Sequence, residues 1–116
     1  MLPLTGDTRG LLDRARLTRL PKGSALINVA RGALVDQAAM TDLLQSRHIG
    51  AATLDVFAHE PLPAGDPLWA MENVLITPHL ASVAIPSSSA KQIADNIVRV
   101  SRGEAPANQV DPSRGY

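Results

Sequence analysis

The first part of the chain alternates between helical spacing and short apolar runs. Apolar residues over positions 11–20 form an imperfect helical stripe, which Pro21 and Gly23 bring to an end. Residues 24–29 follow as an apolar run of strand length. The pattern therefore predicts a helix followed by a buried strand.

The next segment carries the start and stop signals of a second helix. Asp36 is a good N-cap, and Val35 and Met40 on either side of it are spaced to form a hydrophobic staple. We expect Gly50 to supply the left-handed residue that ends this helix. Residues 51–56 then form a second predicted strand, which is apolar enough to be buried.

The remaining pattern predicts a third strand and an amphipathic helix. A proline-rich loop precedes the strand expected over residues 73–77, and Pro78 closes that strand. Ser89 and Gln92 have the spacing of a capping box, and Gly103 would end the helix that follows. The apolar stripe of this helix consists of Ala90, Ile93, Ala94, Ile97 and Val98.

Apolar strands that alternate with helices are typical of a parallel sheet covered on both faces. The predicted fold class is α/β, with a Rossmann-type parallel sheet and covering helices. Only about three strands are visible, whereas such sheets usually have about five or six, and the sequence has no Gly-x-Gly-x-x-Gly fingerprint. We therefore expect the chain to be the C-terminal half of such a sheet.

Composition narrows the function classes. The 116 residues allow one domain at most, and eleven basic residues balance eleven acidic ones, so no net charge draws the chain to nucleic acid or an anionic membrane. The absence of cysteine excludes disulfides and thiol nucleophiles and fits a reducing cytoplasm. No apolar run approaches the ~18 residues of a spanning helix. We expect a soluble, cytoplasmic protein that acts on a small molecule.

Polar residues follow each of the three predicted strands. They are Arg31, then Asp55 with Glu60, and then His79. Ligands of open α/β sheets bind outside the carboxyl ends of the strands, so these side chains can converge on one crevice. An Arg fork can hold a carboxylate through two hydrogen bonds, a His can pass a proton to or from an oxygen, and Glu60 could orient His79. This predicts a site that binds a 2-keto acid and protonates its oxygen as hydride arrives.

Two other kinds of site are not expected. His48, His59 and His79 lack the spacing of metal ligands on a helix, and cysteine is absent, so no metal site is predicted. The Ser87-Ser88-Ser89 run is expected to cap a helix rather than to supply a nucleophile, because no Gly-x-Ser-x-Gly elbow occurs.

Five short motifs occur along nearly the whole chain, and their order is more specific than any one of them. They are Leu2-Pro3-Leu4-Thr5, Asn28-Val29-Ala30-Arg31-Gly32, Leu54-Asp55-Val56-Phe57, Glu60-Pro61-Leu62 and Thr77-Pro78-His79. In these motifs the chain resembles the D-2-hydroxyacid dehydrogenase family. Its ending, Asn108-Gln109-Val110-Asp111 with Arg114-Gly115-Tyr116, is similar to the glyoxylate/hydroxypyruvate reductase A branch.

The resemblance implies a role for each site residue. Arg31 would grip the substrate carboxylate and carbonyl, His79 would be the general acid/base, and Glu60 its orienting partner. Asp55 would lie near the nicotinamide, where a carboxylate can accept hydrogen bonds from the carboxamide and favour the oxidised ring. The implied cofactor is NAD(P), with NADP preferred in this branch, and the implied cofactor-binding residues are Leu2, Pro3, Val29, Ala30, Arg31, Asp55, His79, Leu80, Ala81 and Ser82.

The resemblance also implies an organisation. Residues 1–83 would be the second half of a nucleotide-binding domain, and residues 84–116 would be a crossover helix and tail that belong to the substrate domain. The full-length protein would be a homodimer that reduces glyoxylate or hydroxypyruvate. Because the pyrophosphate-binding loop and most of the substrate domain would lie upstream of Met1, we expect the chain alone to be inactive.

Two alternatives to an ordinary reductase fragment stay open. The chain could be a non-catalytic binding or assembly module that retains part of the fold. It could also be a truncated gene product or the result of a mis-set start codon, with Met1 internal to a longer protein. The sequence leaves open the choice between NAD and NADP, the 2-keto acid, the oligomeric state and whether the chain folds alone.

Overall fold

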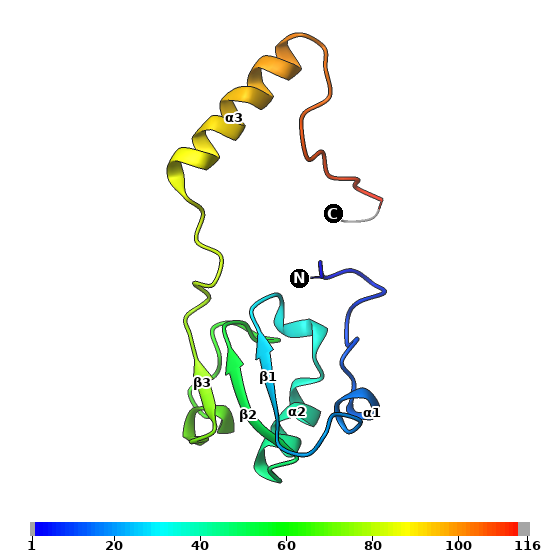
Figure 1. Cartoon of the computed structure of the whole chain (residues 1–116), viewed down its shortest axis with the longest axis vertical. Coiled ribbons are helices and arrows are strands. Elements are labelled where there is room, and N and C mark those ends of the chain that lie inside the picture. The colour runs from blue at the N-terminus through cyan, green and yellow to red at the C-terminus, as the bar shows by residue number, and fades with distance from the viewer. Residues whose placement is uncertain (1, 114–116) are drawn as a thin grey trace. The chain divides into compact units, whose positions relative to one another are not determined.

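A three-stranded parallel sheet forms the centre of the first part of the chain (Figure 1). The computed structural model describes residues 2–113 and divides into two compact units, one ending at Ala81 and one beginning at Ser82. In the first unit, β1 (Ser24–Asn28), β2 (Ile49–Leu54) and β3 (Val74–Ile76) lie in the order β1-β2-β3. The predicted α/β fold class and the three predicted strands are confirmed.

The strand order is sequential, as it is in the second half of a doubly wound sheet with the order 3-2-1-4-5-6. β2 is the central strand, and within residues 2–113 no strand pairs with the outer edge of β1 or of β3. In a complete sheet of this kind, the outer edge of β1 would be the edge that meets the first half. The observed order therefore agrees with the predicted half-sheet.

The core lies on one face of this sheet. α2 (Gln37–Gln45) packs on β2, and α1 (Arg14–Leu17) packs on α2. Two 3-10 turns, η1 (Gly32–Leu34) and η2 (Pro67–Ala70), complete the unit. The buried apolar cluster consists of Leu17, Leu34, Val35, Ala39, Met40, Leu43, Leu44, Ile49, Ala52, Leu54, Leu62 and Leu68.

The other face of the sheet is exposed. Ile27, Thr53 and Leu75 are paired across the three strands, and Ile27 and Leu75 are 69% and 60% exposed. Alternate residues of a strand point to opposite faces, so this row lies on the face away from the core. The expectation of cover on both faces is thus met on one face only within the first unit.

The start of α2 is confirmed as predicted. Asp36 is the N-cap, and its Oδ1 accepts a hydrogen bond of 3.0 Å from the Ala39 N–H. Val35 and Met40 are both buried, as a hydrophobic staple across the cap requires. Local sequence therefore fixes where this helix begins.

The predicted end of α2 was wrong. The left-handed residue is Arg47, with φ of 57°, and Gly50 lies within β2. A Cβ at Gly50 would be 2.6 Å from the Gly23 carbonyl oxygen. Gly50 is therefore required by close packing between two chain segments, which helical spacing cannot reveal.

The first helix is also shorter than predicted. α1 begins after Asp13, whose carboxylate accepts a hydrogen bond from the Arg16 N–H, and it ends at Leu17. Leu12 lies outside it, because its N–H bonds the Leu34 carbonyl and it forms an isolated parallel bridge with Val35. A tertiary pairing thus replaces the first part of the predicted helix.

The second unit is built on α3 (Pro86–Ser101), and no residue of this helix is buried. The predicted capping box was wrong: Ile85 is the N-cap, Pro86 occupies the first turn, and the Ser89 N–H already bonds the Ile85 carbonyl. Proline suits the first helical position because its missing N–H is not needed there. Gly103 follows the helix with φ of 77°, as expected of a glycine that ends a helix.

The tail folds back along α3. The Asn96 side chain exchanges two hydrogen bonds with the Ala107 backbone, and Arg99 Nε donates to the Ala105 carbonyl. The motif Arg114-Gly115-Tyr116 lies outside the described residues. No helix within residues 2–113 has the length and apolar character needed to cross a membrane.

Candidate active site

The strands end at one edge of the sheet, and backbone hydrogen bonds join the residues that follow them. The Asp55 N–H donates to the Asn28 carbonyl at 3.0 Å, and the Thr77 N–H donates to the Leu54 carbonyl at 3.0 Å. The loops that carry Arg31, Glu60 and His79 therefore begin at neighbouring points.

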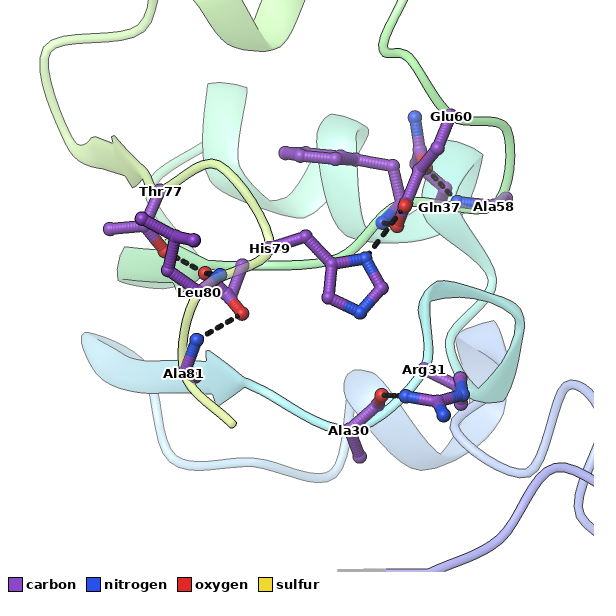
Figure 2. A network of polar contacts seen from close by, with 11 residues as sticks. Ala30, Arg31, Gln37, Ala58, Glu60, Thr77, His79, Leu80 and Ala81 are labelled. Atoms are coloured by element: carbon purple, nitrogen blue, oxygen red, sulfur yellow. Dashed lines mark hydrogen bonds and ion pairs between the residues drawn. The ribbon is translucent and has the colours of Figure 1, made fainter. Parts of the chain in front are cut away.

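Asn28 shapes the loop that carries Arg31. This buried side chain accepts a hydrogen bond from the Ala30 N–H and donates one to the Arg31 carbonyl, each at 3.1 Å. Arg31 itself is exposed, and its Nη1 donates to the Ala30 carbonyl at 2.8 Å (Figure 2). Asn28 was not among the predicted site residues, although an Asn side chain that bonds the backbone two residues on is a known turn signal.

Gly32 brings the Arg31 loop against the loop that carries Glu60. A Cβ at Gly32 would lie 1.9 Å from the Phe57 carbonyl carbon and 2.4 Å from the Ala58 nitrogen. These are backbone atoms, so they cannot move aside as a flexible side chain could. Only a glycine permits this contact.

Gln37 ties the same loop to α2. Its side-chain oxygen accepts a hydrogen bond of 3.0 Å from the Ala58 N–H, and its amide nitrogen donates to Asp66 Oδ2 at 3.2 Å. Gln37 is the first residue of α2, and a surface glutamine there carries no signal of such a role in the sequence. Sequence reasoning missed it for that reason.

Glu60 and His79 form a direct pair. His79 Nδ1 lies 2.8 Å from Glu60 Oε2, and Glu60 Oε1 accepts a hydrogen bond of 2.8 Å from the Phe57 N–H. The hydrogen bonds from Phe57 and His79 lower the pKa of Glu60, and the charges of His79 and Arg31 act in the same direction. Figure 2 shows the His79 ring between Glu60 and Arg31, with its second nitrogen directed away from Glu60.

Asp55 lies beneath the His79 loop and is 2% exposed. Its Oδ1 accepts hydrogen bonds from Thr77 Oγ1 and from the Leu80 N–H at 2.9 Å, and its Oδ2 accepts one from the Ala81 N–H at 2.9 Å. The hydrogen bond from Thr77 lowers the pKa of Asp55 most strongly, while desolvation opposes the shift. The carboxylate is therefore held in its charged form.

The other predicted cofactor-binding residues are less closely connected. Val29 is partly buried beside Ala30, whereas Leu2 is 51% exposed and the Pro3 carbonyl accepts a hydrogen bond from Thr8 Oγ1. Within residues 2–113, no hydrogen bond or ion pair joins Leu2 or Pro3 to Arg31, Glu60 or His79. Ser82 is exposed and begins the second unit.

A cleft of about 610 Å³ opens beside Glu60 and His79. Its other lining residues are mostly apolar: Phe57, Pro61, Leu62, Trp69, Ile76 and Pro78, with Asp55 and Thr77. An apolar cleft with a few convergent polar groups is the usual setting of a small-molecule site. Within residues 2–113, no three His, Asp or Glu residues come together as a group that could hold a metal ion.

Known proteins are similar to this chain in sequence and in fold. Residues 1–81 match the family described as D-isomer specific 2-hydroxyacid dehydrogenase, NAD binding domain. Glyoxylate/hydroxypyruvate reductase A of Serratia proteamaculans is 41% identical over all 116 residues, and that of Klebsiella pneumoniae is 42% identical. The chain spans 37% of the length of each of these reductases.

Two solved structures are similar to this chain in fold as well as in sequence. A D-isomer specific 2-hydroxyacid dehydrogenase from Xanthobacter autotrophicus, in complex with NADPH and MES, is 62% identical with a TM-score of 0.96, over 100% of this chain and 48% of that one. An NADPH-dependent glyoxylate/hydroxypyruvate reductase from Sinorhizobium meliloti, in complex with NADP and sulfate, is 36% identical with a TM-score of 0.91, over 100% and 38%. On its matching sequence and fold, the chain belongs to the D-isomer specific 2-hydroxyacid dehydrogenase family.

Proposed function

We propose that the chain is the distal part of an NAD(P)-dependent reductase of a small 2-keto acid, glyoxylate or hydroxypyruvate. Arg31, Glu60 and His79 are its catalytic residues. The observation that carries the proposal is the His79–Glu60 pair at 2.8 Å. The second ring nitrogen of His79 is directed away from Glu60, on the side of the site that carries Arg31 (Figure 2).

Arg31 binds the substrate carboxylate. One of its nitrogens is used by the Ala30 carbonyl, which fixes the side chain, while the rest of the exposed guanidinium stays available. A guanidinium can form two parallel, charge-assisted hydrogen bonds to a carboxylate. This contact would hold the keto carbon of the substrate in one place.

His79 moves the proton. With Nδ1–H donated to Glu60, the other ring nitrogen can donate a proton to the keto oxygen. The nicotinamide, when bound, supplies a hydride to the keto carbon. The carbonyl π bond breaks, its oxygen takes the His79 proton, and the product is the 2-hydroxy acid. Glu60, kept ionised by its lowered pKa, stabilises the protonated ring before the transfer.

The cofactor-binding residues in this proposal are Leu2, Pro3, Val29, Ala30, Arg31, Asp55, His79, Leu80, Ala81 and Ser82. Two oxygens of a carboxylate offer about four acceptor positions, and three are used on Asp55, so Oδ2 can still accept a carboxamide N–H. The residues present thus fit the nicotinamide end of the cofactor. NADP is our preferred form, supported by related structures that hold NADPH or NADP.

The proposal includes an organisation and a location. Residues 1–83 complete a nucleotide-binding domain and residues 84–116 join the substrate domain, in keeping with the division of the chain after Ala81. The complete protein is a cytoplasmic homodimer. The 116 residues are inactive alone, because they contain no glycine-rich loop to hold the cofactor pyrophosphate.

The test is a protein in which these 116 residues replace the matching part of the Serratia proteamaculans reductase, called the joined reductase below. We expect it to oxidise NADPH in the presence of glyoxylate or hydroxypyruvate. His79→Ala should lower kcat by about 10²–10⁴-fold, and Arg31→Ala should raise KM and lower kcat. His59→Ala and Arg19→Ala are matched controls on exposed residues. Parental kinetics in both site variants would overturn the assigned roles.

A non-catalytic assembly module is the second candidate. The exposed Ile27 and Leu75, on either side of Thr53 in one row, support it, since such a face suits another polypeptide. A joined reductase that melts cooperatively, but whose melting temperature NADPH does not raise, would favour the module. A clear rise in melting temperature with NADPH would count against it.

A further inference from the structure

Within residues 2–113, the hydrogen bonds that the Asp55 carboxylate accepts all come from residues around His79. The partners are Thr77, two residues before His79, and Leu80 and Ala81, the two residues after it. The carboxylate is buried and ionised. Asp55 follows β2, whereas the loop that it holds follows β3. The His79 loop is therefore fixed on both sides from a single group.

The loop needs such a constraint. His79 has φ of 56°, in the left-handed region that residues with a Cβ seldom adopt. Strained residues of this kind persist only where their surroundings determine the conformation, and they gather at functional sites. This backbone conformation sets the direction in which the His79 ring leaves the chain, toward Glu60.

We propose that Asp55 and Thr77 form a clamp that positions His79 for proton transfer, independently of any contact between Asp55 and the nicotinamide. This inference rests on the proposed function. Asp55 and Thr77 act through His79, so they are positioning residues. The Thr77 hydroxyl donates to Oδ1, which leaves Oδ1 aligned for the Leu80 N–H and Oδ2 for the Ala81 N–H.

The clamp makes a distinctive prediction for Thr77. Thr77→Val keeps the shape of the side chain and removes the donor, whereas Thr77→Ser keeps the hydroxyl. In the joined reductase, Thr77→Val should lower kcat by about tenfold or more, since a small displacement of a catalytic group is costly. KM for NADPH should change much less than kcat, and Thr77→Ser should retain the parental kcat.

Asp55→Asn supplies a second variant. It replaces one acceptor oxygen with an N–H donor that faces a backbone N–H, so it opens the clamp while keeping the size of the side chain. We expect it to lower kcat and to combine less than additively with Thr77→Val, because both act through one contact. The matched controls are Thr18→Val, which removes a hydroxyl that donates to the Ala15 carbonyl, and Asp42→Asn on the exposed surface.

Two results would overturn the clamp. One is a parental kcat and pH–rate profile in Thr77→Val. The other is an Asp55→Asn protein whose only change is a raised KM for NADPH, which would leave Asp55 as a nicotinamide contact alone.

A spectroscopic measurement separates failure of the clamp from failure of the proposed function. If the joined reductase folds but reduces neither keto acid, the proposed function fails. The clamp is then judged by NMR on the full 116-residue chain, from the Nδ1 proton of His79 in its hydrogen bond to Glu60. This signal should persist in Thr77→Ser and be lost in Thr77→Val; its persistence in both would overturn the clamp.

Discussion

The two units of the chain are stabilised in opposite ways. The first unit has a buried apolar cluster and a set of polar contacts that joins its three strand ends, whereas α3 in the second unit buries none of its residues. The first unit thus has a core and a preorganised site of its own. The stability of α3 depends on its local start and stop signals and on any surface that covers its apolar stripe.

Removing a core side chain should give the largest change in stability. Leu44 is fully buried, so Leu44→Ala should lower the free energy of unfolding by about 2–5 kcal/mol. Ile97→Ala removes a similar side chain from α3, where it is 65% exposed, and should have little effect. Chemical denaturation measures both. A large loss for Ile97→Ala would mean that α3 is covered in solution, and the contrast between the units would fail.

Adding one methyl group between the site loops should come next. Gly32→Ala places a Cβ against the Phe57 backbone and should cost about 1–3 kcal/mol through overpacking. It should also lower kcat in the joined reductase, since it separates the Arg31 loop from the Glu60 loop. Gly65→Ala, where the added Cβ meets nothing within 4 Å, is the control. Equal stability of the two variants would show that the loops are not in close contact.

Removing a helix cap should lower stability by a smaller amount, and it should do so in α2 but not in α3. Asp36→Ala deletes the N-cap of α2 and should cost about 1 kcal/mol. Ser89→Ala should cost almost nothing, because Ser89 lies inside α3 and Pro86 begins that helix. Thermal unfolding of both proteins tests this. A comparable loss for Ser89→Ala would restore the capping box that the sequence predicted.

The smallest expected effect is the change in stability with pH that comes from Asp55 and Glu60. The pKa values of Asp55 and Glu60 are lowered in the folded chain, so unfolding takes up protons at these groups in acid. Their contribution is present above the unfolded values of about 4 and is lost as pH falls through the lower folded values. Melting temperature measured from neutral to acidic pH should therefore fall below about pH 4. Asp55→Asn should make the melting temperature fall less in acid. An unchanged dependence on pH would argue against an ionised Asp55 in the folded chain.

Local signals explain which parts of the fold were predictable. The Asp36 cap, the three apolar strands and the glycine after α3 each depend on residues close together in the sequence. Arg31, Glu60 and His79 could be selected because each follows a strand, and the strand ends do meet. Their catalytic roles remain proposals. Leu12 and Gly50 were misassigned because a distant segment decides their conformation.

The sequence by itself determined the α/β class, the parallel half-sheet and the positions of the candidate catalytic residues. Periodicity and capping act over one or two turns of chain, so they can be read without knowing the fold. Only the tertiary structure decided that Gly32 packs on Phe57 and that Asp55 fastens Thr77, Leu80 and Ala81 around His79. These contacts join residues about 25 positions apart, and their physical basis is close packing and hydrogen-bond geometry, which exist only after the strands have paired.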